Sequence, residues 1–179
     1  MAEDFSAAPL DRIVDLAGVS LRLIEWPGLA GPLVHVPDPR SPDHTLVGQF
    51  AETLAPRYRV LSLTPRGDSA YQVDAADLLA TLDQFGFATP VLLAEGLGCV
   101  AAVLLAAWHT GRVAGLVLVD PIYDPLFSDG LAARALQDCP PDWPALRRAI
   151  ACPVLVLQKT AAFPRDVEQF LAQLEPGLT

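Results

Sequence analysis

Basic residues are scarce in this sequence, and Lys159 is the only lysine. Lys and Arg together number 12 against 21 Asp and Glu, so the formal net charge is -9 at pH 7. This balance disfavours binding to nucleic acid or to anionic membrane surfaces, because both attract Lys and Arg. The chain also lacks a run of about 20 apolar residues, the length that a membrane-spanning helix needs. Residues 1–12 are acidic and lack the cationic and apolar regions of a signal peptide.

Cysteine is equally scarce, with Cys99, Cys139 and Cys152 lying apart from one another. An odd and unclustered set of cysteines suits free thiols in a reducing compartment better than a disulfide framework or a zinc site. We therefore expect a cytoplasmic protein that binds no metal and no other cofactor. The chain has 179 residues, of which 52% are hydrophobic. We expect residues 1–179 to form a single domain around one hydrophobic core.

Apolar segments alternate with helical patterns along the chain, which is typical of βαβ units and a parallel sheet. Residues 11–18 and 19–26 predict an antiparallel pair that turns at Gly18. The further strands are expected at 32–36, 58–63, 90–94, 115–121 and 152–158. The helices are expected at 44–55, 73–85, 97–109 and 165–174. In helix 73–85 the periodicity places on the inner face Val73, Ala76, Leu79, Leu82 and Phe85. Prolines and glycine predict irregular or short helical structure over 122–150.

The stretch VLLAEGLGCVAA, residues 91–102, combines a strand, a turn of small residues and an alanine-rich helix. This order is the setting of a nucleophile elbow, G-x-S-x-G. The elbow residues here are Glu95, Gly96, Leu97 and Gly98. Gly96 takes the nucleophile position and has no side chain. Glycine relieves the strain of such a turn, and close approach of a ligand is the alternative reason for its presence.

The order of these segments resembles the α/β-hydrolase fold family over essentially the whole chain. In PLVHVPDPRS, residues 32–41, Pro37-Asp38 stands where the family has His-Gly. TPRGDS, residues 64–69, is similar to a shortened Asp-x-Arg-Gly-x-Gly-x-Ser stretch. The elbow, HTGRVAGLVLVDP and CPVLVLQKTAAFP follow in the family's order. The resemblance implies a mostly parallel, twisted sheet of about seven strands with helices on both faces, and an eighth strand missing.

The resemblance also implies a triad of nucleophile, acid and histidine in that chain order. Gly96 occupies the nucleophile position. No carboxylate follows strand 152–158 before Asp166, and the chain reaches Thr179 before the strand that precedes the family's histidine. The segment 122–150 is too short for the family's helical cap. We therefore expect a member without triad or cap domain, and we assign no catalytic residue.

Three kinds of residue near the elbow have alternative interpretations. Cys99 lies one helical turn beyond the elbow among apolar neighbours, so we expect a small buried hydrophobe more than a replacement nucleophile. His35 lies between two valines of a strand and is interpreted as a hydrogen-bonded core residue. Carboxylates at the ends of strands form either an acidic pocket rim or a solvated set of loop residues, and their spacing predicts no metal site. The candidate rim residues beside the elbow are Pro37, Asp38, Asp120, Tyr123 and Asp124.

The leading functional hypothesis is a non-catalytic binding or assembly subunit. One alternative is a small esterase, thioesterase or lyase-like enzyme whose active site has moved near the elbow. The other is a small-molecule receptor that uses the vestigial pocket. The resemblance places strand 152–158 at a sheet edge, and folded proteins usually cover an uncharged apolar edge. We expect a homodimer, or a dedicated protein partner, at this edge. The candidate interface residues are Val154, Val156, Gln158 and Phe170.

Overall fold

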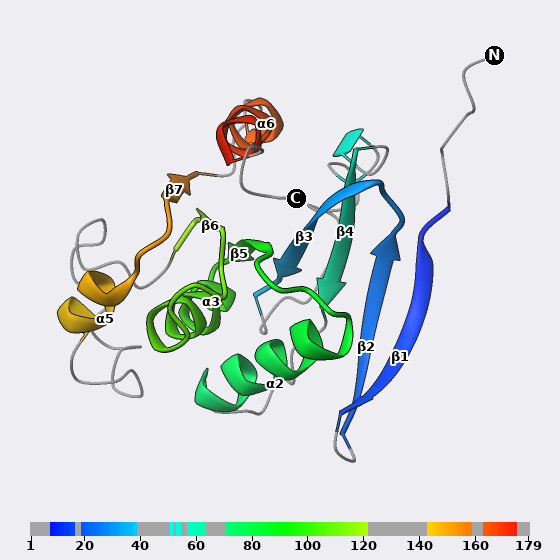
Figure 1. The fold of residues 1–179 in the computed structure, drawn as a ribbon, viewed down its shortest axis with the longest axis horizontal. Helices are drawn as coiled ribbons and strands as arrows, with labels where there is room; N and C mark the ends of the chain where they lie inside the picture. Colours follow the sequence, from blue (N-terminus) through cyan, green and yellow to red (C-terminus); the bar gives the residue numbers. More distant parts are fainter. Residues whose placement is uncertain are drawn as a thin grey trace.

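The computed structural model describes residues 8–16, 19–38, 51, 53–54, 57–63, 71–121, 143–158 and 163–174. These residues form one seven-stranded sheet with helices packed on both faces (Figure 1). The predicted fold class, a mostly parallel α/β sheet, is confirmed. Most of the expected helix 44–55 and the segment 122–142 lie outside the described residues. No helix within the described part of the chain is long and apolar enough to cross a membrane.

The sheet has the strand order β1-β2-β4-β3-β5-β6-β7. Its strands are β1 Leu10–Leu16, β2 Val19–Trp26, β3 Ala30–Val36, β4 Tyr58–Leu63, β5 Val91–Glu95, β6 Gly115–Val119 and β7 Val154–Leu157. β1 pairs antiparallel with β2, as predicted, and β2 pairs antiparallel with β4. The remaining neighbours are parallel. β5 and β6 are buried along almost their whole length, as parallel strands between helical layers should be.

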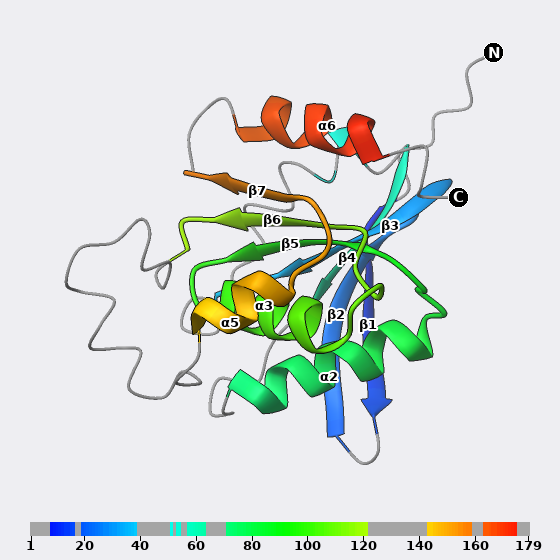
Figure 2. The same ribbon diagram turned by 60° about the vertical axis from the view of Figure 1, so that its left-hand side comes forward.

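Among the described residues, four helices cover the two faces of the sheet. They are α2 Tyr71–Gln84, α3 Gly98–Trp108, α5 Trp143–Ala149 and α6 Phe163–Leu174. In Figure 2, α6 lies above the sheet, and α2, α3 and α5 lie below it. Each face has its own apolar core. The core on the side of α2 and α3 includes Leu92, Leu105 and Leu116, whereas the core on the side of α6 includes Leu33, Leu93 and Leu171.

The inner face of α2 differs from the predicted one. Ala75, Leu78 and Leu82 are buried, and Ala76, which was assigned to the inner face, is exposed. Leu79 and Phe85 pack against the same core but are only partly buried, and the side chain of Val73 is not described. Two sets of residues, each spaced by three or four positions, could form the inner face of α2, and Leu82 belongs to both sets. The packing of α2 against α3 decides between them, and the sequence of α2 alone does not contain that information.

A buried charge joins the antiparallel end of the sheet to its parallel part. The Glu25 side chain on β2 is 5% exposed and forms ion pairs with Arg12 on β1 and Arg59 on β4. The guanidinium of Arg59 lies 4.8 Å from the centre of the Phe87 ring, just beyond α2. Pairing from both sides compensates for the removal of this carboxylate from water. The hydrophobic pattern of the sequence does not predict this cluster, because Glu25 occupies a buried position of β2 at which the pattern would place an apolar residue.

We expect Leu82→Ala to lower the free energy of unfolding by about 2–5 kcal/mol, because it leaves a cavity in a packed core. Leu82 is fully buried, whereas Leu79 is only partly buried. Leu79→Ala is therefore the matched control and should cost less. Urea unfolding measures both values. A loss below about 1 kcal/mol for Leu82→Ala would contradict the observed orientation of α2.

Candidate functional site

The elbow joins β5 to α3 at the carboxyl ends of the parallel strands, where open α/β sheets place their functional groups. β5 ends at Glu95, and α3 begins at Gly98. Gly96 has a φ of 51°, in the left-handed region that glycine adopts without strain from a Cβ atom. Its N–H donates a hydrogen bond of 3.1 Å to the carbonyl of Val119 at the end of β6. The turn therefore has the strained geometry that the sequence predicts, and it is fixed to the neighbouring strand.

The carboxylate of Asp38 lies where the nucleophile's side chain would begin. A Cβ atom built on Gly96 would lie 2.2 Å from Oδ2 of Asp38 and 2.9 Å from its Cγ. The residues before it approach the start of α3 equally closely, since a Cβ atom on Gly98 would lie 2.5 Å from the carbonyl oxygen of Val36 and 2.6 Å from that of Pro37. Both glycines are thus required by the approach of the chain's own segment 36–38.

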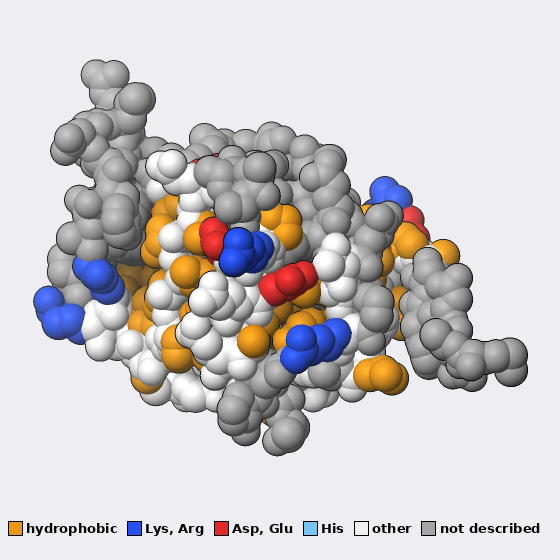
Figure 3. All heavy atoms as spheres, turned by 90° about the horizontal axis from the view of Figure 1, so that it is seen from above, with side chains coloured by type: hydrophobic (Ala, Val, Ile, Leu, Met, Phe, Trp, Pro, Cys, Tyr) orange, Lys and Arg blue, Asp and Glu red, His pale blue; other side chains and the backbone are white. Residues whose placement is uncertain are grey.

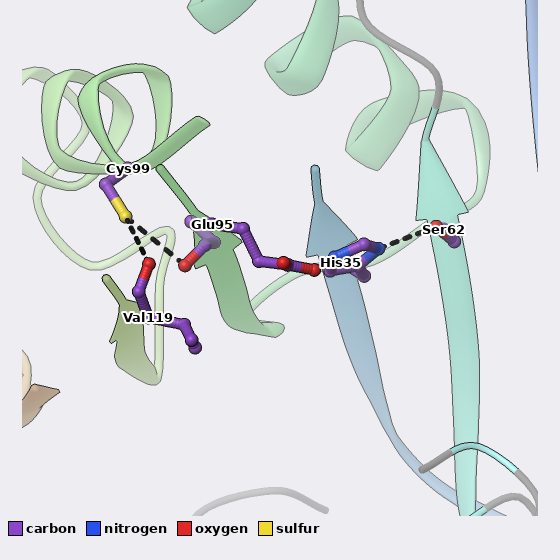
Figure 4. A network of polar contacts seen from close by, with 6 residues as sticks. His35, Ser62, Glu95, Cys99 and Val119 are labelled. Carbon is purple, nitrogen blue, oxygen red and sulfur yellow. Dashed lines mark hydrogen bonds and ion pairs between the residues drawn. The ribbon is translucent and has the colours of Figure 1, made fainter. Parts of the chain in front are cut away.

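His35 connects three adjacent strands through two hydrogen-bonded contacts (Figure 4). Its Nδ1 lies 2.7 Å from Oγ of Ser62 on β4, and its Nε2 lies 2.6 Å from Oε1 of Glu95 on β5. His35 is fully buried, so the prediction of a hydrogen-bonded core histidine is confirmed. Sequence reasoning missed Ser62. The available signal was a small hydroxyl residue within the predicted strand YRVLSL, which the structure pairs in register with His35.

A hydroxyl, an imidazole and a carboxylate in line are the components of a hydrolytic relay. Here, however, Ser62 has no exposed surface, so a substrate cannot reach its oxygen. The imidazole satisfies both contacts when its Nε2–H donates a hydrogen bond to Glu95 and its Nδ1 accepts one from the hydroxyl of Ser62. Buried polar groups that are fully hydrogen-bonded stabilise a unique packing. The network therefore holds the ends of β4, β3 and β5 in register and fixes the side chain of Glu95, the first residue of the elbow.

Cys99 lies in the first turn of α3 and is 4% exposed. Its Sγ lies 3.2 Å from the carbonyl oxygen of Ala94 and 3.8 Å from that of Val119 (Figure 4). Burial is the main cause that raises the pKa of the Cys99 thiol, and the negative charges of Glu95, Asp38 and Asp120 raise it further. The thiol therefore stays protonated at neutral pH. The expectation that Cys99 is a small buried residue is confirmed.

The described rim residues surround the elbow in different ways. Pro37 is buried. Asp38 is half-buried, and its carboxylate occupies the space that a side chain at position 96 would need. Asp120 is exposed and has a φ of 44°, and its N–H donates a 2.9 Å hydrogen bond to the carbonyl of Leu157 on β7. Tyr123 and Asp124 lie outside the described residues. Within the described ranges, no group of three or more metal-ligating side chains is brought together.

The candidate interface residues fall into two groups. Val154 and Val156 on β7 are 44% and 36% exposed, and Gln158 is exposed beyond them. Phe170 is only 8% exposed, because it turns inward from α6 onto the sheet beside Gly115. Phe170 therefore belongs to the core, and its assignment to the interface is corrected. Figure 3 shows the face on the side of α6, where hydrophobic side chains lie among scattered acidic and basic ones.

Comparison with known proteins finds similar structures but no match by sequence. No protein-family model matches the sequence, and no curated protein matches it. A membrane phospholipase A, described as a bacterial virulence factor, matches with a TM-score of 0.69 and 13% identity, over 93% of this chain and 86% of that one. An N-formylmaleamic acid deformylase from Pseudomonas putida matches with a TM-score of 0.56 and 27% identity, over 64% and 48%.

A haloalkane dehalogenase loop variant from Bradyrhizobium elkanii matches with a TM-score of 0.57 and 20% identity, over 65% of this chain and 41% of that one. The chain thus spans less than half the length of the deformylase and of the dehalogenase. These neighbours are α/β-hydrolase-fold proteins, and this chain has the seven-stranded, mostly parallel sheet with helices described above. The chain has an α/β-hydrolase-like fold.

Gly96→Ala should lower the free energy of unfolding by about 1–3 kcal/mol or more, because it adds a left-handed alanine and displaces the Asp38 carboxylate. Gly86→Ala is the matched control, since Gly86 has a φ of 68° but nothing lies within 4 Å of its added Cβ. It should show the backbone cost alone. In urea unfolding, Asp38→Ala should recover part of the loss in Gly96→Ala. Strict additivity of the two substitutions would show that Asp38 does not fill the elbow.

In the native protein, Cys99 should resist alkylation by iodoacetamide at mildly alkaline pH and should react after unfolding in urea. The reagent attacks the thiolate, and the raised pKa of Cys99 keeps the thiol protonated until the pH passes that value. Peptide mass mapping measures the reaction at each cysteine. Half-buried Cys152 provides the comparison for partial access. Rapid native labelling of Cys99 near neutral pH would identify an activated thiol and favour the enzyme alternative.

Proposed function

We propose that this chain is a non-catalytic α/β-hydrolase-like protein that acts as a binding or assembly subunit. The observation that carries the proposal is the elbow itself, where Gly96 supplies no side chain and the Asp38 carboxylate fills the place that a nucleophile's side chain requires. The chain keeps the strand, the turn and the helix of a nucleophile elbow but has no nucleophilic side chain at the turn. Instead, the turn packs closely against segment 36–38 of the same chain.

The other groups near the elbow support the same proposal. Nucleophilic catalysis needs a nucleophile and a base within hydrogen-bond reach of one another. The thiol of Cys99 is buried, and its hydrogen bonds go to main-chain carbonyls. The imidazole of His35 is fully buried, and both of its ring nitrogens are engaged by Ser62 and Glu95. Neither group is placed to activate a reacting atom at Gly96.

The surface that supports a binding role is the outer edge of β7. β7 is the last strand of the sheet, and it exposes Val154 and Val156. Residues 152–158 contain no charged side chain. Such an edge is a template for pairing with another strand. We propose that a second copy or a protein partner binds here, and that the free thiols of Cys99 and Cys152 reflect a cytoplasmic location.

A second candidate function is an enzyme in which Asp38 is the reacting carboxylate. Its position over Gly96 favours this candidate, because a carboxylate can act as a nucleophile or as a general base. The structurally similar proteins named above include a deformylase, a dehalogenase and a phospholipase, all of which are enzymes. In this candidate the carboxylate comes from the segment after β3 and replaces a side chain missing from the elbow.

One set of assays separates the two candidates. Wild type, Gly96→Ser and Asp38→Asn are assayed with p-nitrophenyl acetate and butyrate, with a short bromoalkane and with a fluorophosphonate label. We expect no turnover and no labelling in any of them, because the imidazole of His35, the base that a hydroxyl at position 96 would need, is buried and already engaged by Ser62 and Glu95. Gly111→Ser is the control for contaminating esterase, since Gly111 has a φ of 86° and open space around its added Cβ.

Each positive result has a distinct meaning in these assays. Turnover by wild type that is lost in Asp38→Asn would establish the second candidate and reject the non-catalytic proposal. Stoichiometric labelling of Gly96→Ser alone would reveal a base that the new hydroxyl can use, with His35 the first residue to test. Equal activity in wild type and Gly111→Ser that does not depend on Asp38 or Gly96 would indicate a contaminating esterase.

A further inference from the structure

The two edges of the sheet are built differently. β1, at one edge, carries Asp11, Arg12 and Asp15, and Asp11 pairs with Arg22 of β2 at 2.6 Å. Charged side chains on an edge strand prevent pairing with another sheet. β7, at the other edge, carries only Val and Leu, and no strand among the described residues lies on its outer side. Of the two edges, only that of β7 lacks this protection.

The outward-facing main-chain groups of β7 follow from its pairing with β6. The carbonyl of Pro153 accepts a hydrogen bond of 2.9 Å from the N–H of Leu116, and the carbonyl of Leu157 accepts one of 2.9 Å from the N–H of Asp120. Main-chain groups of successive residues in a strand point to opposite sides. The groups of Val154 and Val156 therefore point away from β6. Pro153 lacks an N–H, but its missing donor lies on the β6 side and leaves the outer edge intact.

We propose that a second copy of this chain covers this edge, with the two β7 strands paired antiparallel about a two-fold axis. This inference rests on the proposed function, whose binding surface it assigns to a specific partner. In such a pair, Val154 lies opposite Val156 of the partner subunit, and Val156 lies opposite Val154 of the partner subunit. Because both residues direct their main-chain groups outward, each facing pair exchanges hydrogen bonds in both directions.

The side chains match as well as the backbone. Val154 and Val156 lie on the same face of the sheet, because successive residues of a strand alternate between faces. Two exposed valines of one copy therefore meet two of the other, and facing β-branched residues stabilise antiparallel pairs. Each copy has a net charge of -9, so contact through a charged surface would be repulsive. The uncharged segment 152–158 is a surface on which two copies meet without opposing like charges. Isologous contacts of this kind are the commonest form of oligomer.

Hydrogen exchange on the unmodified protein tests the pairing directly. The amides of Val154 and Val156 should be protected at high protein concentration and should exchange faster on dilution below the dissociation constant of the dimer. The amides of Leu155 and Leu157 are internal controls, because they point toward β6 and should stay protected at both concentrations. Rapid exchange at Val154 and Val156 at high concentration, or a monomeric mass by light scattering at micromolar concentration, would overturn the proposal.

Substitution then locates the contact. Val156→Lys should convert the dimer to a monomer at the concentration at which wild type is dimeric, because it brings positive charges close together across the axis. Ile13→Lys is the matched control, since Ile13 is 76% exposed on the opposite edge strand, and it should leave the dimer intact. Circular dichroism and melting establish that each variant is folded. If Val156→Lys does not fold, Val154→Lys takes its place.

The results also separate this inference from the proposed function. A dimer that survives both valine substitutions would place the contact elsewhere and reject the β7 pairing. A folded monomeric wild type that binds a different protein through β7 would keep the binding role and reject the second copy. Ester or haloalkane turnover would reject the non-catalytic function, whereas the exchange pattern of β7 would still decide the pairing.

Discussion

The close approach of segment 36–38 to the start of α3 is the contact on which the arrangement of this site depends. Two glycines permit it, one at the turn and one at the first position of the helix, and the carbonyls of Val36 and Pro37 lie against the second. Because α3 is buried through most of its length, its start cannot retreat from that segment without disturbing the core. The contact therefore fixes three things at once, namely the exit of β3, the entry into α3 and the position of the Asp38 carboxylate.

The polar groups beneath this contact are arranged by the same requirement. Glu95 leaves β5 immediately before the turn, and its carboxylate is held by the imidazole of His35, which Ser62 holds in turn. The carboxylates of Asp38 and Glu95 are two of the three that raise the pKa of Cys99. Burial is the main reason that this thiol stays protonated, and the negative charge around the elbow acts in the same direction. An activated nucleophile would need the opposite electrostatic environment.

Much of the fold could be predicted from the sequence because it depends on local signals. Strand β4 was predicted with its observed bounds, and β5, β6 and β7 agree with their predictions apart from residues at the ends, since buried parallel strands are short apolar runs bounded by Gly and Pro. The orientation of α2 was not predictable in this way, because two helical series share Leu82 and the choice depends on α3. The same limit applies to Phe170, whose helix shows an apolar stripe but not which surface covers it.

The same distinction between local signals and tertiary contacts applies to the candidate site. The glycine at the elbow, the buried thiol and the core histidine followed from residue type and local spacing. The contact between Asp38 and Gly96 did not, because these residues lie far apart in the chain and are brought together only when β3 and β5 pair. Ser62 was missed for the same reason, since a lone serine in a strand gains meaning only when its cross-strand neighbour is known.

The interlock of Asp38 with Gly96 has a consequence for how such a protein can change over generations. Once a carboxylate fills the space above the turn, any side chain acquired at position 96 collides with it, and any change at position 38 that occurs first removes a packed group without a replacement. A lineage in this state must pass through a less stable intermediate before a side chain returns to the turn. The contact therefore makes the present arrangement easier to keep than to reverse.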